Sequence, residues 1–133
     1  MEWMLMPYRR YADFSGRSQR KEYWMFYLLV VIVYVVFSVI MGMGASSIDP
    51  VTGEVAGGGA LASIGFGALA LFWLGSIIPS LAVSIRRMHD QDRSGWWILC
   101  PIANIVFLFI DGTHGPNRFG PDPKDPGQAS AFR

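Results

Sequence analysis

The chain has 133 residues, enough for one domain, and its formal net charge is +1, with 11 Lys and Arg against 10 Asp and Glu. Hydrophobic residues make up 52% and charged residues only 16%, against about 25% charged in a typical soluble domain, so the composition favours a membrane protein. The basic residues form no extended stripe, which argues against a nucleic-acid partner, and the single cysteine, Cys100, excludes an intramolecular disulfide.

A long uncharged run follows the basic N-terminal segment. Residues 1–22 are mixed and basic, whereas residues 23–44 carry no charge. As a helix with a rise of 1.5 Å per residue, about 22 residues extend roughly 33 Å, which exceeds the roughly 30 Å hydrocarbon core of a bilayer. The run is also longer than the apolar part of a signal peptide, which has about 7–15 residues. Residues 23–44 therefore predict a first transmembrane helix.

A second uncharged run predicts a second transmembrane helix. It covers residues 60–85 and follows a glycine-rich loop at residues 45–59. Pro79 lies inside this run, and we expect a kink there because proline cannot donate a backbone hydrogen bond. Small residues recur every four positions on one face of each predicted helix, a pattern that lets helices approach closely. These helix-packing candidates are Ser38, Gly42, Ser46, Ser76, Ser80 and Ser84.

A charged loop and a third, shorter apolar segment come next. The loop covers residues 86–95, and the apolar segment covers residues 96–110. About 15 residues make roughly 22 Å of helix, short of the usual span, so this segment either crosses with local thinning or re-enters the membrane. We expect the crossing and keep the re-entrant or interfacial arrangement as the alternative. Residues 111–133 are dense in Pro and Gly and predict a non-helical tail.

The distribution of Lys and Arg predicts the orientation. Cytoplasmic loops are enriched in these residues. Here they occur in residues 1–22 and in the 86–95 loop but not in residues 45–59. We therefore expect a multi-pass protein whose N-terminus and charged loop are cytoplasmic and whose 45–59 loop is external. A full third crossing would place the tail outside, and a re-entrant segment would keep it inside.

Aromatic and basic residues meet at the predicted membrane edges. Tyr and Trp prefer the headgroup level, and Arg beside them can hold lipid phosphates. The stretches GRSQRKEYW and DRSGWW have this layout, so we expect contacts with a bilayer that carries anionic headgroups. The predicted interface anchors are Arg17, Arg20, Tyr23, Trp24, Trp96 and Trp97.

The charged loop contains acids, which anchoring does not require. If the second helix continues beyond residue 85, Asp90 lies four residues after Arg86 and three after Arg87, which are the spacings of ion pairs on a helix. A sharper alternative takes His89, Asp90 and Asp92 as metal ligands or acid–base groups, although their spacing matches no zinc or calcium pattern. A turn in the tail would dock onto this loop if both lie on one side. The candidate functional network comprises Arg86, Arg87, His89, Asp90, Arg93, Asn117 and Arg118.

Three separated motifs resemble one known family. They read FSGRSQRKEYW (Phe14–Trp24), RRMHDQDRSGWW (Arg86–Trp97) and GTHGPNRFGPDP (Gly112–Pro123). In this order they resemble the domain-of-unknown-function 805 family, the YhaH-like small bacterial inner-membrane proteins. The likeness extends over about residues 8–124 and implies an integral protein of the bacterial inner (plasma) membrane, without implying an activity. The matching positions are Phe14, Gly16, Arg17, Arg20, Glu22, Tyr23, Trp24, Arg86, Arg87, His89, Asp90, Arg93, Ser94, Gly95, Trp96, Gly112, Thr113, Gly115, Asn117, Arg118, Gly120 and Pro123.

The chain departs from the family pattern at two places. Members often have Ser at the position of Gln19, where it would form a capping box with Glu22, so the start of the first helix is expected to shift. The last apolar segment of the family is usually longer than residues 96–110.

The predicted fold class is all-α, a small polytopic membrane helical bundle with three apolar segments, the third of them short. We expect a non-enzymatic assembly or interaction component that forms a homo-oligomer or binds a membrane partner protein, without a cofactor or metal. One alternative is a small transporter or channel component for a small or lipidic solute, lined by Ser76, Ser80 and Ser84. Another is a metal-dependent membrane enzyme that uses the acids and histidine of the charged loop. The two predicted spans contain no acid, base or histidine, which argues against an ion or proton path.

Overall fold

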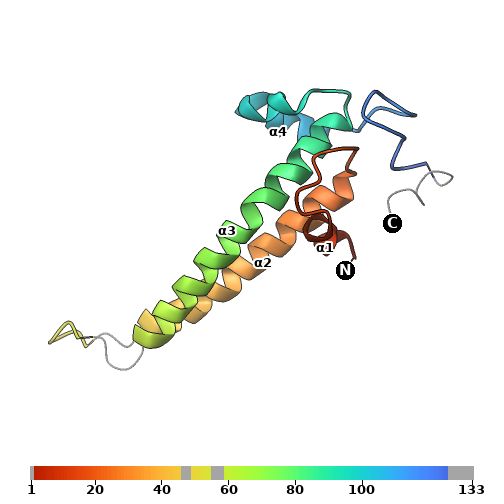
Figure 1. Ribbon diagram of the computed structural model, residues 1–133. Coiled ribbons are helices and arrows are strands. Elements are labelled where there is room, and N and C mark those ends of the chain that lie inside the picture. Colours follow the sequence, from red (N-terminus) through yellow and green to blue (C-terminus); the bar gives the residue numbers. More distant parts are fainter. Residues whose placement is uncertain (1, 46–48, 55–58, 126–133) are drawn as a thin grey trace. The chain divides into compact units, whose positions relative to one another are not determined.

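The computed structural model describes residues 2–45, 49–54 and 59–125 (Figure 1). Its elements in chain order are α1 (Glu2–Arg9), α2 (Arg20–Ala45), α3 (Gly59–His89), the 3-10 helix η1 (Gly95–Leu99) and α4 (Pro101–Phe109). Within these ranges the only β-type pairing is an isolated bridge between Asn117 and Gly120. The predicted class, a small all-α membrane protein, is confirmed.

The chain divides into two units. Unit 1 comprises residues 1–27 and 78–133, and unit 2 comprises residues 28–77. Unit 1 therefore holds α1, the first turns of α2, the last turns of α3, η1, α4 and the tail. Unit 2 holds the remaining turns of the two long helices and the loop that joins them.

The helices α2 and α3 are long and apolar enough to cross a bilayer. The candidate spans are Arg20–Met43 and Ala62–His89, so both continue into charged residues beside the uncharged runs. Only 6% of the most apolar stretch of α2 is buried within the chain, whereas the core helix of a soluble protein is mostly buried. α3 is helical on both sides of Pro79, which is itself buried. The kink there stays a prediction.

In unit 2 the two long helices meet at Gly65. This glycine is buried, and a Cβ atom added to it would lie 3.1 Å from Cγ of Met41 and 3.8 Å from Cγ2 of Ile40. A larger residue would push the helices apart, so Gly65 permits their close approach.

Unit 1 has a small apolar core. Phe26 of α2 lies in it together with Val83 and Met88 of α3, and all three are fully buried. α1 adds to this core because the ring of Tyr8 packs 5.4 Å from that of Phe26. The sequence did not predict α1. A helix of 8 residues is marginal alone and depends on such packing for its stability.

A Schellman motif ends α3 and turns the chain. The backbone N–H of Arg93 donates to Met88 O at 3.1 Å, and that of Asp92 donates to His89 O at 3.0 Å, the two bonds of this motif. Asp92 has a left-handed φ of 55°, which Asp adopts more readily than most L-residues. After the turn the chain returns close to α3, because a Cβ added to Gly95 would lie 2.8 Å from Cγ2 of Ile85.

The third apolar segment forms two short helices. η1 ends at Leu99, and Pro101 begins α4, a position where proline is favoured because its missing N–H needs no partner. With 9 residues, α4 is about 13.5 Å long, less than half of the roughly 30 Å hydrocarbon core. α4 is therefore much shorter than a usual span, and the crossing of residues 96–110 stays a prediction.

Candidate functional site

A buried carboxylate between two guanidinium groups lies at the end of α3. Nε of Arg17 donates to Oδ1 of Asp90 at 3.0 Å, and Nη1 of Arg87 donates to Oδ2 of the same carboxylate. All three side chains are at most 2% exposed. Burial raises the pKa of Asp90, and the charges of Arg87 and Arg17 oppose that rise. The expected helical pair between Arg87 and Asp90 is present, and Arg17 joins it from 73 residues away.

Arg17 also binds the tail. Its Nη1 donates to the carbonyl of Gly115 at 2.6 Å, and its Nη2 donates to that of Thr113 at 2.5 Å. Oδ1 of Asp122 lies 4.0 Å from Nη2 and adds a second, weaker charge contact. A planar guanidinium presents its donors in a fixed fork, so one side chain here fixes two backbone positions of the tail.

The tail passes close to Asp90. Thr113 donates its backbone N–H to the carbonyl of Asp90 at 2.8 Å. The preceding Gly112 leaves no space for a side chain, because an added Cβ would lie 2.0 Å from Oδ2 of Asp90. Glycine is thus required here for the backbone of the tail to reach the carboxylate.

A second buried ion pair lies beside the first. Nη2 of Arg86 donates to Oε1 of Glu22 at 2.9 Å, and the hydroxyl of Ser18 donates to Oε2 at 2.7 Å. Nη1 of Arg86 binds the carbonyl of Asp13 at 3.1 Å, and the N–H of Ser18 binds the carbonyl of Arg86 at 3.2 Å. Arg86 therefore pairs with the start of α2 and not with Asp90, the partner that its helical spacing had suggested. Arg86 and Arg87 are both within helical spacing of Asp90, and Arg87 is the one that binds its carboxylate.

The buried charges in the described part of unit 1 balance. Three cations and three carboxylates there are each at most 9% exposed: Arg17, Arg86, Arg87, Glu22, Asp90 and Asp122. Such a set is tolerated because each charge has a partner, and removing one member of a buried pair costs about 3–5 kcal/mol. Two buried donors, the Nε atoms of Arg86 and Arg87, have no hydrogen-bond partner among the described residues. We call the six buried charged residues the charge network.

The turn of the tail docks onto the end of α3, as its predicted position allowed. Nδ2 of Asn117 donates to the carbonyl of His89 at 2.9 Å, and Arg118 pairs with Asp92 at 3.1 Å. The ring of His89 stacks on that of Phe119, with centroids 3.9 Å apart. Its Nδ1 lies 3.2 Å from the carbonyl of Gly16. His89 thus contacts both the tail and the N-terminal segment.

An outer group of ion pairs surrounds Asp111. Arg20 and Lys124 each approach this carboxylate at 2.6 Å, and their hydrogen bonds, that of Lys124 first, hold its pKa below its usual value. Arg20 also donates to the carbonyl of Phe109 at 2.6 Å. A shallow cavity of about 290 Å³ lies here, lined by Gln19, Arg20, Lys21, Asp111 and Lys124.

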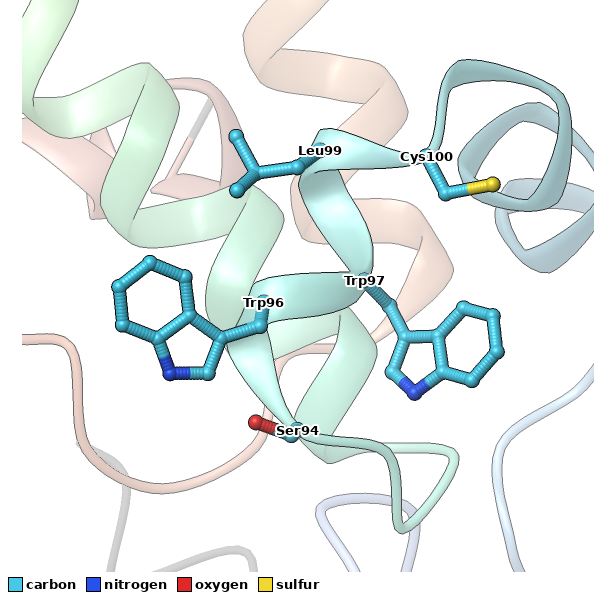
Figure 2. Close-up of a pocket in the computed structure, with 5 residues that line it drawn as sticks. All are labelled: Ser94, Trp96, Trp97, Leu99 and Cys100. Atoms are coloured by element: carbon cyan, nitrogen blue, oxygen red, sulfur yellow. The ribbon is translucent and has the colours of Figure 1, made fainter.

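An open apolar surface lies on η1. Figure 2 shows Trp96 and Trp97 pointing to different sides of the short helix. Together with Ser94, Leu99 and Cys100 they line a hollow of about 320 Å³. Trp96 is 80% exposed. The guanidinium of Arg93 lies 5.5 Å from the ring of Trp97, within the range of a cation–π contact. The guanidinium of Arg93 also lies 5.3 Å from the ring of Phe107, so this predicted network residue contacts aromatic rings.

The six predicted interface anchors divide into two groups. Arg17 and Tyr23 are only 1% and 7% exposed, which corrects the expectation that they face lipid headgroups. Arg17 is instead held by Asp90, a partner that its local sequence does not reveal. The other four anchors are partly or largely exposed, and their contact with headgroups stays a prediction: Arg20, Trp24, Trp96 and Trp97.

The predicted serine face of α3 bonds to its own helix. The hydroxyls of Ser76 and Ser84 donate at 2.7 Å to the carbonyls of Phe72 and Ser80, four residues earlier. Ser76 and Ser84 are buried and Ser80 is partly buried. Hydroxyls bound in this way satisfy their hydrogen-bonding capacity within the helix and leave a small surface for packing.

The predicted small-residue face of α2 is open. Ser38 and Gly42 are exposed, and in the described part of the chain no neighbouring atom lies within 4 Å of a Cβ added to Gly42. Ser46, the third member, lies outside the described residues.

The loop acids and histidine have separate partners. Asp90 binds two arginines, Asp92 binds Arg118, and His89 stacks on Phe119. Across the described ranges, no three His, Cys, Asp or Glu side chains are placed to share a metal ion.

Several residues of the site were not identified from the sequence as site residues. Glu22 and Asp122 are members of the charge network, and Ser18, Gly112 and Thr113 contact it. All five lie inside the three motifs, and their position in those motifs was the only available signal. Asp122 has a lowered pKa: burial alone would raise it, but hydrogen bonds from the N–H groups of Lys124 and Gly115 outweigh that effect.

The comparisons with known proteins agree with the motif likeness. A family model described as "Protein of unknown function (DUF805)" matches residues 11–121. The chain is 39% identical over 132 residues to "Inner membrane protein YhaH" of Escherichia coli (strain K12), which covers 93% of this chain and 98% of that protein. It is 38% identical over 131 residues to "Inner membrane protein YhaI" of the same strain, with 93% and 97% covered. No solved structure matches. The chain is an integral membrane protein and belongs to the DUF805 family.

Proposed function

We propose that this protein is a non-enzymatic component of the bacterial inner membrane that assembles with copies of itself or with a partner membrane protein. The observation that carries the proposal is the open face of Ser38 and Gly42 on α2. No atom of another described element lies within 4 Å of a Cβ added to Gly42. In unit 2 the contact between α2 and α3 uses Met41 and Gly65 instead. Small residues at a spacing of four on a lipid-exposed face suit the approach of another transmembrane helix.

The charge network supports a structural role. Its arginines bind carboxylates and backbone carbonyls of the same chain, and these contacts join the N-terminal segment, the end of α3 and the tail. A network of this kind makes unit 1 rigid and leaves its outer surface as the part that meets other molecules.

The inner membrane and the orientation are part of the proposal. The relatives carry "Inner membrane protein" in their names. The basic residues near the charged ends of both spans favour a cytoplasmic N-terminus by the positive-inside rule. Arg20, Lys21 and Lys124 line the shallow cavity at the start of α2, where anionic headgroups would bind.

Native mass spectrometry of the protein extracted from its own membrane in mild detergent tests the assembly. We expect a defined complex that Gly42→Leu dissociates, because leucine fills the open face. Gly67→Leu is the matched control, since Gly67 is also exposed on a long helix with nothing within 4 Å of an added Cβ. A monomeric wild type, or a complex equally stable with Gly42→Leu, would overturn the proposal.

A further inference from the structure

We infer that η1 and α4 lie along the surface of the membrane that the protein spans, on the side of its N-terminus, and that the chain crosses the bilayer only twice. The occupant of their exposed apolar face is the interfacial layer of that bilayer. The tail then lies on the same side as the N-terminal segment. This inference does not depend on the proposed assembly.

Both ends of the η1–α4 segment are held at one membrane edge. η1 begins at Gly95, shortly after His89, the last residue of the second candidate span. At the other end, Arg20 donates to the carbonyl of Phe109 at 2.6 Å, and Arg20 is the first residue of the first candidate span. The ring of Trp24, one turn into that span, packs 5.3 Å from the ring of Phe109. A segment that starts and ends at the same edge does not cross.

The exposed side chains fit a lipid interface. The most exposed apolar side chains of η1 and α4 are those of Trp96 (80% exposed), Leu99 (73%), Ile102 (77%), Ile105 (59%) and Phe109 (63%). An apolar surface of this extent on a soluble unit would be a liability, but here the bilayer begins at the adjoining spans. Tryptophans are typical of the headgroup level, and the cation–π contact of Arg93 with Trp97 holds a charge at the same depth.

The contacts of the tail require it to lie on the same side of the membrane as the N-terminal segment. Arg17 binds the carbonyls of Thr113 and Gly115, and Asn117 binds that of His89. Nε2 of Gln19 also donates to the carbonyl of Pro123. A third crossing would put residues 111–125 on the far side of the bilayer and break every one of these contacts.

Cysteine labelling from each side of the membrane tests the topology. The only native thiol, Cys100, is exposed and is first replaced by serine. Single cysteines are then placed at His114 in the tail, at Ala12 in the N-terminal segment and at Val51 in the 45–59 loop, all exposed positions. A membrane-impermeant maleimide is applied to spheroplasts and to inverted vesicles, with detergent-opened membranes as the measure of full labelling. Pro116→Cys, also exposed, is a second tail reporter in case His114→Cys does not fold.

The expected result is that the tail reporter labels from the same face as Ala12→Cys and from the opposite face to Val51→Cys. Labelling of the tail from the same face as Val51→Cys, or from both faces, overturns the inference. A tail reporter that is silent on both faces until detergent is added also overturns it, because the tail is then not at a surface.

Electron paramagnetic resonance of a spin label at Cys100 or at Ile105→Cys tests the depth of the segment in lipid nanodiscs. For a segment at the interface, we expect both labels to be accessible to a water-soluble nickel chelate and to oxygen at a shallow depth. A label at Ile105→Cys near the middle of the bilayer, which a crossing by residues 96–110 requires, overturns the inference. Low accessibility to both reagents would show that protein and not lipid covers the face, and would overturn the assigned occupant.

Discussion

Replacing Gly112 with alanine tests the closest contact between the tail and the charge network. The added Cβ would meet Oδ2 of Asp90 at 2.0 Å and Cγ at 2.4 Å, whereas real Cβ atoms keep about 3.0 Å or more. Either the carboxylate or the backbone of the tail must therefore move by about 1 Å. A shift of the carboxylate away from Arg17 lengthens the 3.0 Å bond from Arg17 Nε to Asp90 Oδ1 to about 4 Å, beyond hydrogen-bond range. A shift of the tail instead lengthens the 2.8 Å bond from the N–H of Thr113 to the carbonyl of Asp90.

The expected loss of stability follows from the cost of disrupting the ion pair between Arg17 and Asp90. Disrupting a buried charge pair costs about 3–5 kcal/mol when a partner is removed outright, and here the partner is displaced. We expect Gly112→Ala to lower the free energy of unfolding in mixed micelles by about 3 kcal/mol. Gly75→Ala is the control, because nothing lies within 4 Å of an added Cβ there. We expect its stability to equal or slightly exceed that of the wild type.

A double-mutant cycle identifies the cause. In an Asp90→Ala background the carboxylate is absent, so adding Gly112→Ala is expected to cost less than about 1 kcal/mol more. Wild-type stability for Gly112→Ala alone would refute the placement of Gly112 against Asp90. A full loss in the Asp90→Ala background would show that Gly112 matters for another reason.

Three further predictions concern other parts of unit 1. Glu22→Gln leaves the buried Arg86 without a charge partner and is expected to destabilise by about 3 kcal/mol, whereas Glu22→Leu combined with Arg86→Met is expected to recover much of the loss in the same unfolding assay. Gly95→Ala brings a Cβ 2.8 Å from Cγ2 of Ile85 and is expected to lower the thermal midpoint of unfolding. Adding Ile85→Ala in the same chain is expected to relieve the clash, and midpoint losses of the two variants that simply add would contradict the contact. Hydrogen bonds from Ser15 and Arg10 outweigh the effect of burial and hold the pKa of Asp13 at about 2, below the usual 3.8, so its stabilisation is complete above pH 3.8 and is lost as the pH falls towards 2. Unfolding midpoints at pH 6 and pH 3 are expected to differ less in Asp13→Asn than in the wild type, and equal differences would contradict the lowered pKa.

The sequence was sufficient for features that depend on local pattern. The uncharged runs at residues 23–44 and 60–85 coincide with most of α2 and α3, because the bilayer requires a long apolar helix and the requirement is visible in composition. The pair of Arg87 with Asp90 follows from a spacing of three on one helix. The motif likeness led to the family before any contact was known.

Features that depend on distant partners were not predictable in this way. Arg17 looked like a headgroup anchor beside Tyr and Trp, and only the folded chain brings Asp90 to it across 73 residues. Arg86 had two candidate partners, Asp90 and Glu22. Its pairing with Glu22 depends on how the start of α2 meets the end of α3 within unit 1. The need for glycine at position 112 arises from a backbone approach, for which composition carries no signal. Helix α1 is too short for its pattern to be distinguished from a loop.

The most direct test of the charge network is solid-state NMR of the protein in lipid bilayers. With nitrogen-15 and carbon-13 labels, through-space transfer between the guanidinium nitrogens of Arg17 and the carboxyl carbon of Asp90 reports their separation without any mutation. The 3.0 Å contact between Nε and Oδ1 predicts a strong cross-peak that builds up at short mixing times. A missing cross-peak, with the intrahelical pair of Arg87 and Asp90 still visible as an internal reference, would contradict the joining of the N-terminal segment to the end of α3.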